Sequence, residues 1–197
     1  VLVMTRDITE RRGYERRIQH MAYHDTLTGL WNRNALSSAL ASVLLDLDRS
    51  ESSPKPKTAA LLYLDLDKFK RINDTLGHAI GDDLLKVVAE RIGGALRPTD
   101  LVTRAETQVD DPLARVGGDE FCVILTTIDN PMDAGRVAAR IVEIVGAPIE
   151  LEGHELVVTP SIGIALMPQD GHDPDTLLKH ADRAMYVAKE GGRNRVC

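Results

Sequence analysis

Two glycines followed by two acids interrupt an apolar stretch near the middle of the chain. In "ARVGGDEFCVIL", residues 114–125, Gly117 and Gly118 precede Asp119 and Glu120, and the segments on either side look like buried strands. A buried carboxylate without a partner is costly and glycine weakens the interior of a strand, so packing alone does not explain this choice of residues. A tight hairpin with exposed acids is the purely structural alternative.

A second pair of acids ends an apolar run, "AALLYLDLD", at Asp65 and Asp67. The run is short enough for a strand buried on both faces. If the hairpin lies beside that strand, then Asp65, Asp119 and Glu120 form a cluster of oxygen ligands, which suits Mg²⁺ or Mn²⁺. Acids on adjacent strand ends are the arrangement that two-metal phosphoryl transfer uses. Glycines without a Cβ let the backbone approach a phosphate closely.

The elements that must position these acids begin with a helix that Asn32 can cap. The segment "KFKRINDTLGHAIGDD", residues 68–83, is predicted to be a loop that leads to an amphipathic helix, and Pro98 disfavours continuing that helix past Arg97. A hairpin around the Gly-Gly-Asp-Glu tetrad follows, with "FCVIL" as its second strand.

The second half is predicted to hold two more helices. Asn130 and Pro131 begin the first, and Asp173-Pro174 begins the last. Between them a hairpin turn at 152–154 is expected to introduce a strand, "LVVTPSIGIAL". The order helix, strand, helix, strand, strand, helix, strand, helix predicts an α/β (α+β) fold, a ferredoxin-like or palm-like split βαβ whose helices flank a sheet with antiparallel pairs.

Length and composition predict one globular domain. The 197 residues are 43% hydrophobic and 27% charged, and the net charge of -6 argues against a broad nucleic-acid surface. The sequence has no apolar run of transmembrane length and no signal-peptide pattern, which favours a cytoplasmic domain without membrane contact. Cys122 is expected to be buried and Cys197 to lie in a frayed terminus, and none of the six histidines is assigned to a metal.

Five segments together resemble the GGDEF family of diguanylate cyclases. They are "HDTLTGLWNR" (24–33), "LDLDKFKRINDTLGHAIGDDLL" (64–85), "RVGGDEF" (115–121), "SIGIA" (161–165) and "ADRAMYVAKEGGRNRV" (181–196). The resemblance identifies residues 24–197 as a GGDEF catalytic domain. The opening "TRDITERR" is similar to the end of a PAS sensor domain, so residues 1–23 are expected to be that end and a helical linker.

The resemblance implies a reaction in which two GTP molecules, bound to two facing domains, condense to cyclic di-GMP and release two pyrophosphates. Each chain then holds half of the site, and a homodimer is needed for catalysis. The family uses two Mg²⁺ or Mn²⁺ ions per active site. Asp65, Asp119 and the Leu66 carbonyl match the metal ligands. Asp119 is also placed to help deprotonate the attacking hydroxyl, and Glu120 belongs to the catalytic acids. Asp67 matches an acid whose role is either structural or to support the metal ligands from outside.

Further matches concern the nucleotide. Asn73 and Asp82 match the residues that recognise guanine, for which a carboxylate can accept two hydrogen bonds. Their structural alternatives are a loop-capping Asn and a helix N-cap Asp. Lys189 and Arg193 match the basic pair for the β- and γ-phosphates, which the backbone amides near Lys68 and Phe69 assist. Helix C-terminal cations favoured by the dipole are the alternative for that basic pair.

An inhibitory product site is implied by Arg97-Pro98-Thr99-Asp100, which matches the family's Arg-x-x-Asp motif in type. Roughly ten extra residues within 105–114 separate it from the tetrad, and its companion arginine is either Arg136 or Arg140.

Three functions are weighed. The leading one is an active diguanylate cyclase. The second is a catalytically silent GGDEF module that binds GTP or cyclic di-GMP and regulates an attached or partner domain. The third, a cyclase for another base, is disfavoured by Asp82.

Overall fold

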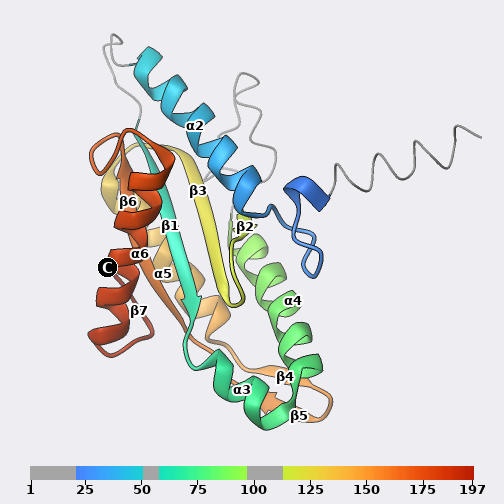
Figure 1. The fold of residues 1–197 in the computed structure, drawn as a ribbon. Helices are drawn as coiled ribbons and strands as arrows, with labels where there is room; N and C mark the ends of the chain where they lie inside the picture. The colour runs from blue at the N-terminus through green and yellow to red at the C-terminus, as the bar shows by residue number, and fades with distance from the viewer. Residues whose placement is uncertain (1–20, 51–57, 97–112) are drawn as a thin grey trace, which may run out of the picture.

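The computed structural model describes residues 21–50, 58–96 and 113–197 (Figure 1). The expected PAS end and most of the linker, the Arg97–Asp100 motif and most of the extra residues at 105–114 lie outside these ranges. The helices are α2 (Arg33–Ser50), α3 (Phe69–Leu76), α4 (His78–Ala95), α5 (Pro131–Val145) and α6 (Pro174–Glu190). The strands are β1 (Thr58–Leu66), β2 (Leu113–Arg115), β3 (Glu120–Ile128), β4 (Ile149–Leu151), β5 (His154–Leu156), β6 (Pro160–Met167) and β7 (Arg195–Val196).

The central sheet has the strand order β2-β3-β1-β6-β7. Strand β1 pairs antiparallel with both β3 and β6, and β7 pairs parallel with β6. β1 is nearly all apolar and buried along eight of its nine residues because strands and helices surround it. The predicted mixed fold with an antiparallel-containing sheet between helices is confirmed.

Alternate residues of β1 pack into two different apolar cores. Ala60, Leu62 and Leu64 join α4 and α5 on one face. Leu61 and Tyr63 join α2 and α6 on the other. Figure 1 accordingly shows α6 in front of the sheet and α5 behind it. This alternation directs Asp65, two residues beyond Tyr63, to the face that α6 covers.

The predicted helix starts are confirmed. Asn32 caps α2 by accepting hydrogen bonds from the N–H groups of Asn34 and Ala35 at 2.9 and 3.1 Å. Asn130 forms a capping box with Asp133 at the start of α5. The Asp173 side chain accepts a hydrogen bond from the Thr176 N–H at the start of α6.

The predicted loop over residues 68–83 is wrong, because this segment is helical. It contains α3 and the first turn and a half of α4, which Gly77 joins with φ 89°. A helix of eight residues has little stability by itself, so the residue pattern of α3 predicts it only weakly. Packing against α4 stabilises it. The alternative of Asp82 as a helix N-cap is wrong as well, since Asp82 lies inside α4.

The hairpin turn predicted at 152–154 is confirmed, since β4 and β5 pair across it in a small separate sheet. The continuous strand predicted over 156–166 is wrong, because β5 ends at Leu156 and β6 begins only at Pro160. The short strand β7 was not predicted. Cys197 is not frayed: its N–H donates to the Ile162 carbonyl and its carbonyl accepts from the Ile164 N–H, both at 2.9 Å. Cys122 is buried, as expected.

No helix in the described part of the chain is both long and apolar enough to span a membrane.

Gly163 allows β6 and α6 to pack closely. A Cβ there would lie 2.1 Å from the Ala181 carbonyl oxygen and 2.2 Å from the Met185 amide nitrogen, both backbone atoms of α6. Gly163→Ala is therefore expected to lower the free energy of unfolding by about 3 kcal/mol, measured by urea denaturation. Gly135→Ala is the matched control, because nothing lies within 4 Å of a Cβ on that α5 residue. The control is expected to gain about 0.5–1 kcal/mol. Equal stability of the two variants would contradict the packing argument.

Candidate active site

The acids of the two sequence motifs lie at the same edge of the sheet. Asp65 and Glu120 occupy paired positions on β1 and β3. The Leu66 N–H donates to the Asp119 carbonyl at 3.2 Å, which fixes the hairpin turn beside the end of β1. The structure thus brings Asp65, Asp119 and Glu120 together as the sequence predicts.

A lysine from α6 enters this cluster. The Lys189 Nζ lies 2.7 Å from Asp65 Oδ2, and their side chains are 27% and 13% exposed. Burial raises the pKa of Asp65, with Lys189 acting against this rise and the Asp119 and Asp67 charges adding to it. Burial also raises the pKa of Asp119, which Glu120 raises further and Lys189 lowers. The edge therefore carries more negative charge than its single lysine neutralises, which is the condition that favours cation binding.

Asp67 serves as an anchor for backbone and neighbouring strands. Its side chain is 4% exposed. It accepts hydrogen bonds from Thr159 Oγ1 at 2.7 Å, Ser161 Oγ at 2.8 Å and the Asn194 N–H at 3.0 Å. Arg193 Nε lies 3.9 Å from Asp67 Oδ1, the oxygen that also accepts from Ser161. Because its oxygens are occupied by donors, Asp67 holds the loop after α6 against the end of β1.

Lys68 and Arg193 flank the start of α3. Lys68 adopts the left-handed conformation with φ 61° and occupies the N-cap of α3, without a side-chain cap. Amide groups at a helix N-terminus are free to bind an anion. Arg193, also left-handed with φ 65°, is half exposed. Backbone amides and basic side chains are therefore available on one side of the carboxylates.

Asn73 and Asp82 come from the two helices α3 and α4. The Asn73 Oδ1 is buried and accepts no hydrogen bond from any described residue. A Cβ on Gly81 would lie 1.8 Å from this atom, so the helices approach one another only because residue 81 is glycine. Asp82, the next residue, is exposed. A buried polar atom without a partner is unusual, and a ligand donor is one way to satisfy it.

The glycines of the tetrad have different surroundings. A Cβ on Gly117 would lie 2.3 Å from Glu120 Oε2, whereas one on Gly118 would meet nothing within 4 Å. A side chain at position 117 would therefore displace the Glu120 carboxylate, which folds back over the turn. Only Gly118 is open in the way that phosphate approach needs.

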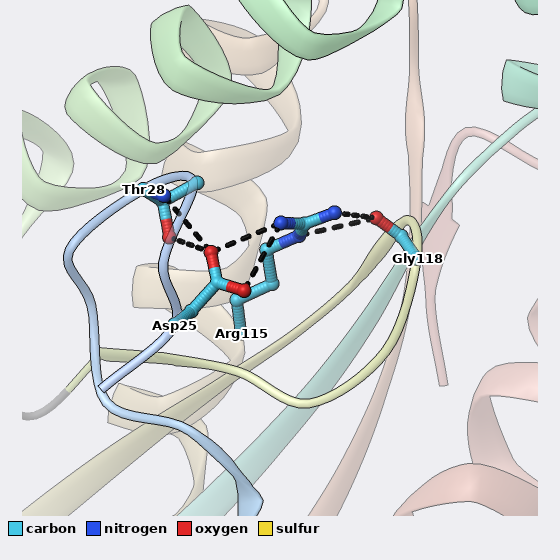
Figure 2. Close-up of polar contacts among 4 residues, drawn as sticks. All are labelled: Asp25, Thr28, Arg115 and Gly118. Atoms are coloured by element: carbon cyan, nitrogen blue, oxygen red, sulfur yellow. Dashed lines mark hydrogen bonds and ion pairs between the residues drawn. The ribbon is translucent and has the colours of Figure 1, made fainter. Parts of the chain in front are cut away.

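The sequence did not predict an ion pair between Asp25 and Arg115, which contacts the turn of the Gly-Gly-Asp-Glu tetrad at Gly118 (Figure 2). Arg115 Nη1 lies 2.9 Å from Asp25 Oδ1, and Arg115 Nε and Nη2 donate to the Gly118 carbonyl at 3.1 and 2.7 Å. The Thr28 N–H and hydroxyl also donate to Asp25, at 2.9 and 2.7 Å. Burial opposes ionisation of Asp25, but the Thr28 and Arg115 hydrogen bonds hold its pKa below 3.8. The sequence signal that could have identified this pair is the opposite charge of Asp25, in segment 24–33, and Arg115, in segment 115–121.

A double-mutant cycle tests this pair. Arg115→Met, Asp25→Asn and the double variant are expected to give a coupling energy of about 1–2 kcal/mol in urea denaturation at pH 7. Because the pKa of Asp25 is lowered on folding, the stabilisation is fully present above pH 3.8 and is lost as the pH falls through the folded-state pKa. Coupling that is unchanged at pH 2, or absent at pH 7, would contradict the assignment.

Comparison with known proteins agrees with the fold. Residues 22–195 match the family described as "Diguanylate cyclase, GGDEF domain". The chain therefore belongs to the GGDEF-domain diguanylate cyclase family.

Its relatives are longer proteins. An uncharacterized signaling protein of Caulobacter vibrioides is 39% identical over 193 residues, 98% of this chain and 22% of that protein. The diguanylate cyclase TpbB of Pseudomonas aeruginosa is 42% identical over 177 residues, 89% of this chain and 37% of that protein. The cyclic di-GMP phosphodiesterase NbdA of Pseudomonas aeruginosa is 41% identical over 177 residues, 90% of this chain and 20% of that protein. The chain thus spans less than two fifths of each.

Two solved structures are also similar. The GGDEF domain of TpbB matches with a TM-score of 0.75 and 39% identity over 86% of this chain and 96% of that one. The coiled coil and GGDEF domain of DgcB from Caulobacter crescentus, in complex with c-di-GMP, match with a TM-score of 0.77 and 27% identity. This match covers 96% of this chain and 92% of that one.

Proposed function

We propose that this chain is an active diguanylate cyclase domain of a cytoplasmic signalling protein, which condenses two GTP into cyclic di-GMP and two pyrophosphates. The observation that carries the proposal is the pair of carboxylates, buried Asp65 and partly buried Asp119, at one strand edge beside Lys189. A chain that only stabilised its fold would gain nothing from burying like charges together. The reaction of the GGDEF family, in which carboxylates bind metal ions, gives these two side chains a function.

The donor set fits divalent metal ions. Among the described residues no three His, Cys, Asp or Glu side chains form a preformed metal cluster. Asp65, Asp119 and the Leu66 carbonyl would instead hold two Mg²⁺ or Mn²⁺ ions incompletely and leave the other positions to the triphosphate, as hard cations accept phosphate oxygens. When bound, the ions polarise the α-phosphate and stabilise the charge of the leaving pyrophosphate.

The remaining residues position GTP. Asn73 and Asp82 hydrogen-bond guanine, which would satisfy the buried Asn73 oxygen or, with the amide reversed, its nitrogen. Lys189, Arg193 and the amides of Lys68 and Phe69 bind the β- and γ-phosphates. Asp119 accepts the proton of the attacking 3′-hydroxyl as a general base. Glu120, folded over Gly117, completes the acidic edge.

A homodimer supplies the second half-site, because a single chain presents one set of these residues. We therefore expect the rate per chain to rise with protein concentration. An upstream PAS domain and its helical linker are proposed to set the dimer geometry.

Product inhibition through Arg97 and Asp100 is proposed as well. Arg140 Nε donates to the Ala95 carbonyl at 2.6 Å, at the end of α4 that leads to Arg97, whereas Arg136 pairs with Asp133 on its own helix at 2.7 Å. This contact supports Arg140 as the companion arginine.

The second candidate is a catalytically silent module that binds GTP or cyclic di-GMP and regulates another domain. It is favoured by the similarity to NbdA, whose name gives it a phosphodiesterase activity.

One experiment separates the two candidates. The 197-residue chain is incubated at high concentration with GTP and Mg²⁺, and the nucleotides are identified by mass, with Asp119→Asn as the control. Cyclic di-GMP from the wild type alone supports the cyclase. Metal-dependent GTP binding without product, even when the linker is fused to a dimeric coiled coil, supports the silent module.

A further inference from the structure

Tyr63 is a polar side chain inside an apolar strand. Between Thr58 and Asp65 it is the one residue of β1 with a polar side chain, and it is 6% exposed. A buried hydroxyl costs free energy unless it forms a hydrogen bond. Because a phenylalanine would fill nearly the same space without this requirement, packing alone does not account for a tyrosine here.

The sheet register places Tyr63 and Glu120 on the same face. Tyr63 lies opposite Cys122, and Asp65 lies opposite Glu120. Side chains of directly opposite residues share a face, and so do side chains two residues apart along a strand. Tyr63 is therefore a diagonal neighbour of Glu120, at a separation that an aromatic side chain and a long one can bridge.

The Tyr63 ring is held by the core. It belongs to the apolar cluster that also contains Leu178 and Met185 of α6, the helix that lies in front of the sheet in Figure 1. Side chains in a close-packed core have little room to change rotamer. The hydroxyl at the end of the ring therefore occupies a defined position.

The Tyr63 hydroxyl forms a hydrogen bond with the Glu120 carboxylate. Tyr63 is the donor, since an ionised carboxylate can only accept. Within the described residues Glu120 makes no ion pair: Lys189 pairs with Asp65, and Arg115 pairs with Asp25. The hydrogen bond from Tyr63 is thus a specific restraint on a charged side chain that no cation holds in this part of the chain.

The restraint determines where the charge of Glu120 lies. The Glu120 Oε2 atom lies over Gly117, at 2.3 Å from the place of a Cβ there. Burial raises the pKa of Asp119 and the Glu120 charge raises it further, so the two carboxylates are close enough to interact. Without the Tyr63 hydroxyl, the partly exposed Glu120 side chain could turn toward water and carry its charge away from this edge.

We propose that Tyr63 is a positioning residue of the acidic edge. Its hydroxyl holds the Glu120 carboxylate over the glycine turn, so that this negative charge lies beside Asp119 when metal ions and GTP bind. This role rests on the proposed function and adds one residue to it: Tyr63 acts through Glu120 and contacts neither metal nor nucleotide.

Tyr63→Phe removes the hydroxyl and keeps the ring. Calorimetry measures the affinity for the Mg²⁺ complex of a GTP analogue whose methylene bridge between the α- and β-phosphates prevents release of pyrophosphate. The variant is expected to bind this complex about threefold more weakly and to lower kcat about tenfold, because a misplaced charge costs more in the transition state than in the ground state. Tyr186→Phe, which removes the hydroxyl of an exposed tyrosine on α6, is the matched control and changes neither value.

The same substitution in a Glu120→Ala background decides whether Tyr63 acts through Glu120. Tyr63→Phe is expected to have no further effect on affinity or kcat there. An equal loss in both backgrounds would indicate a packing effect of the ring and overturn the positioning role, as would an unchanged affinity and kcat in the single variant. Urea denaturation without nucleotide is expected to show the same coupling, as a change of about fivefold in the unfolding equilibrium constant.

Failure of the proposed function has a different signature. A wild type that neither binds the analogue nor makes cyclic di-GMP would overturn the proposed function and the role of Tyr63 in it, even if the stability coupling is present. If the wild type binds the analogue without turnover, the silent module is supported, and the affinities of the four variants of the cycle alone support or overturn the positioning role.

Discussion

Asp119→Asn is expected to reduce cyclic di-GMP formation at least about a thousandfold and, in the same protein, to raise the melting temperature. The rate falls because an amide neither holds a metal ion as a carboxylate does nor accepts the proton of the attacking hydroxyl. The stability rises because burial disfavours the ionised form of Asp119 in the folded chain, and the neutral amide avoids that cost.

The pH dependence of this stability difference has a definite sign. Folding raises the pKa of Asp119 above 3.8, so the folded state binds the proton more tightly. The wild type is therefore destabilised relative to Asp119→Asn above the folded-state pKa, and the difference disappears as the pH falls below 3.8. Added Mg²⁺ is expected to raise the melting temperature of the wild type more than that of the variant. Asp48→Asn, at an exposed position on α2, is the control and alters neither rate nor pH profile. A variant that melts lower than the wild type at pH 7 would contradict the electrostatic account.

Asp67→Ala is expected to lower the free energy of unfolding by about 3 kcal/mol, measured by urea denaturation. The substitution leaves the Thr159 and Ser161 hydroxyls and the Asn194 N–H without their acceptor. It also releases the loop that carries Arg193, so GTP affinity should fall together with stability.

Asp67→Asn distinguishes hydrogen bonding from charge at this position. Its amide oxygen can accept from Thr159 and Asn194, while its NH₂ group can donate to the Ser161 hydroxyl, which rotates to accept. The Asn variant is therefore expected to lose only about 1 kcal/mol. Asp83→Ala, which removes a half-exposed acid paired with Lys86 at 2.8 Å, is the control and should cost less than about 0.5 kcal/mol. If Asp67→Asn proves as unstable as Asp67→Ala, negative charge rather than acceptor geometry is what the site requires.

Local signals in the sequence were sufficient for part of this fold. The β1 run is continuous and apolar, and Asn130 and Asp173 stand directly before a proline at a helix start, so strand and caps could be predicted. The approach of Asp65 to Asp119 also followed, since each ends or interrupts a strand that had to be buried.

Features that depend on distant partners could not be predicted. α3 exists because its Phe69 and Asn73 pack on Gly81, which a window of eight residues does not reveal. β7 has two residues and is defined only by its pairing with β6. The Asp25–Arg115 contact joins two motifs that lie far apart in the sequence, and their opposite charges alone do not identify them as partners. Asp67 was expected to be structural from the resemblance, but its three donors come from strand ends and a loop that the sequence did not bring together.

The sequence separation of the contacts around the acidic edge has a kinetic consequence. Asp25 and Arg115 are 90 residues apart, Asp67 and Thr159 are 92 apart, and Asp67 and Asn194 are 127 apart. The chain loses conformational entropy when it closes loops of this length, before the contacts that stabilise them have formed, and this slows folding. A partly folded chain with native helices therefore lacks the site altogether, and nucleotide binding during refolding would report the last long-range docking step rather than the formation of secondary structure.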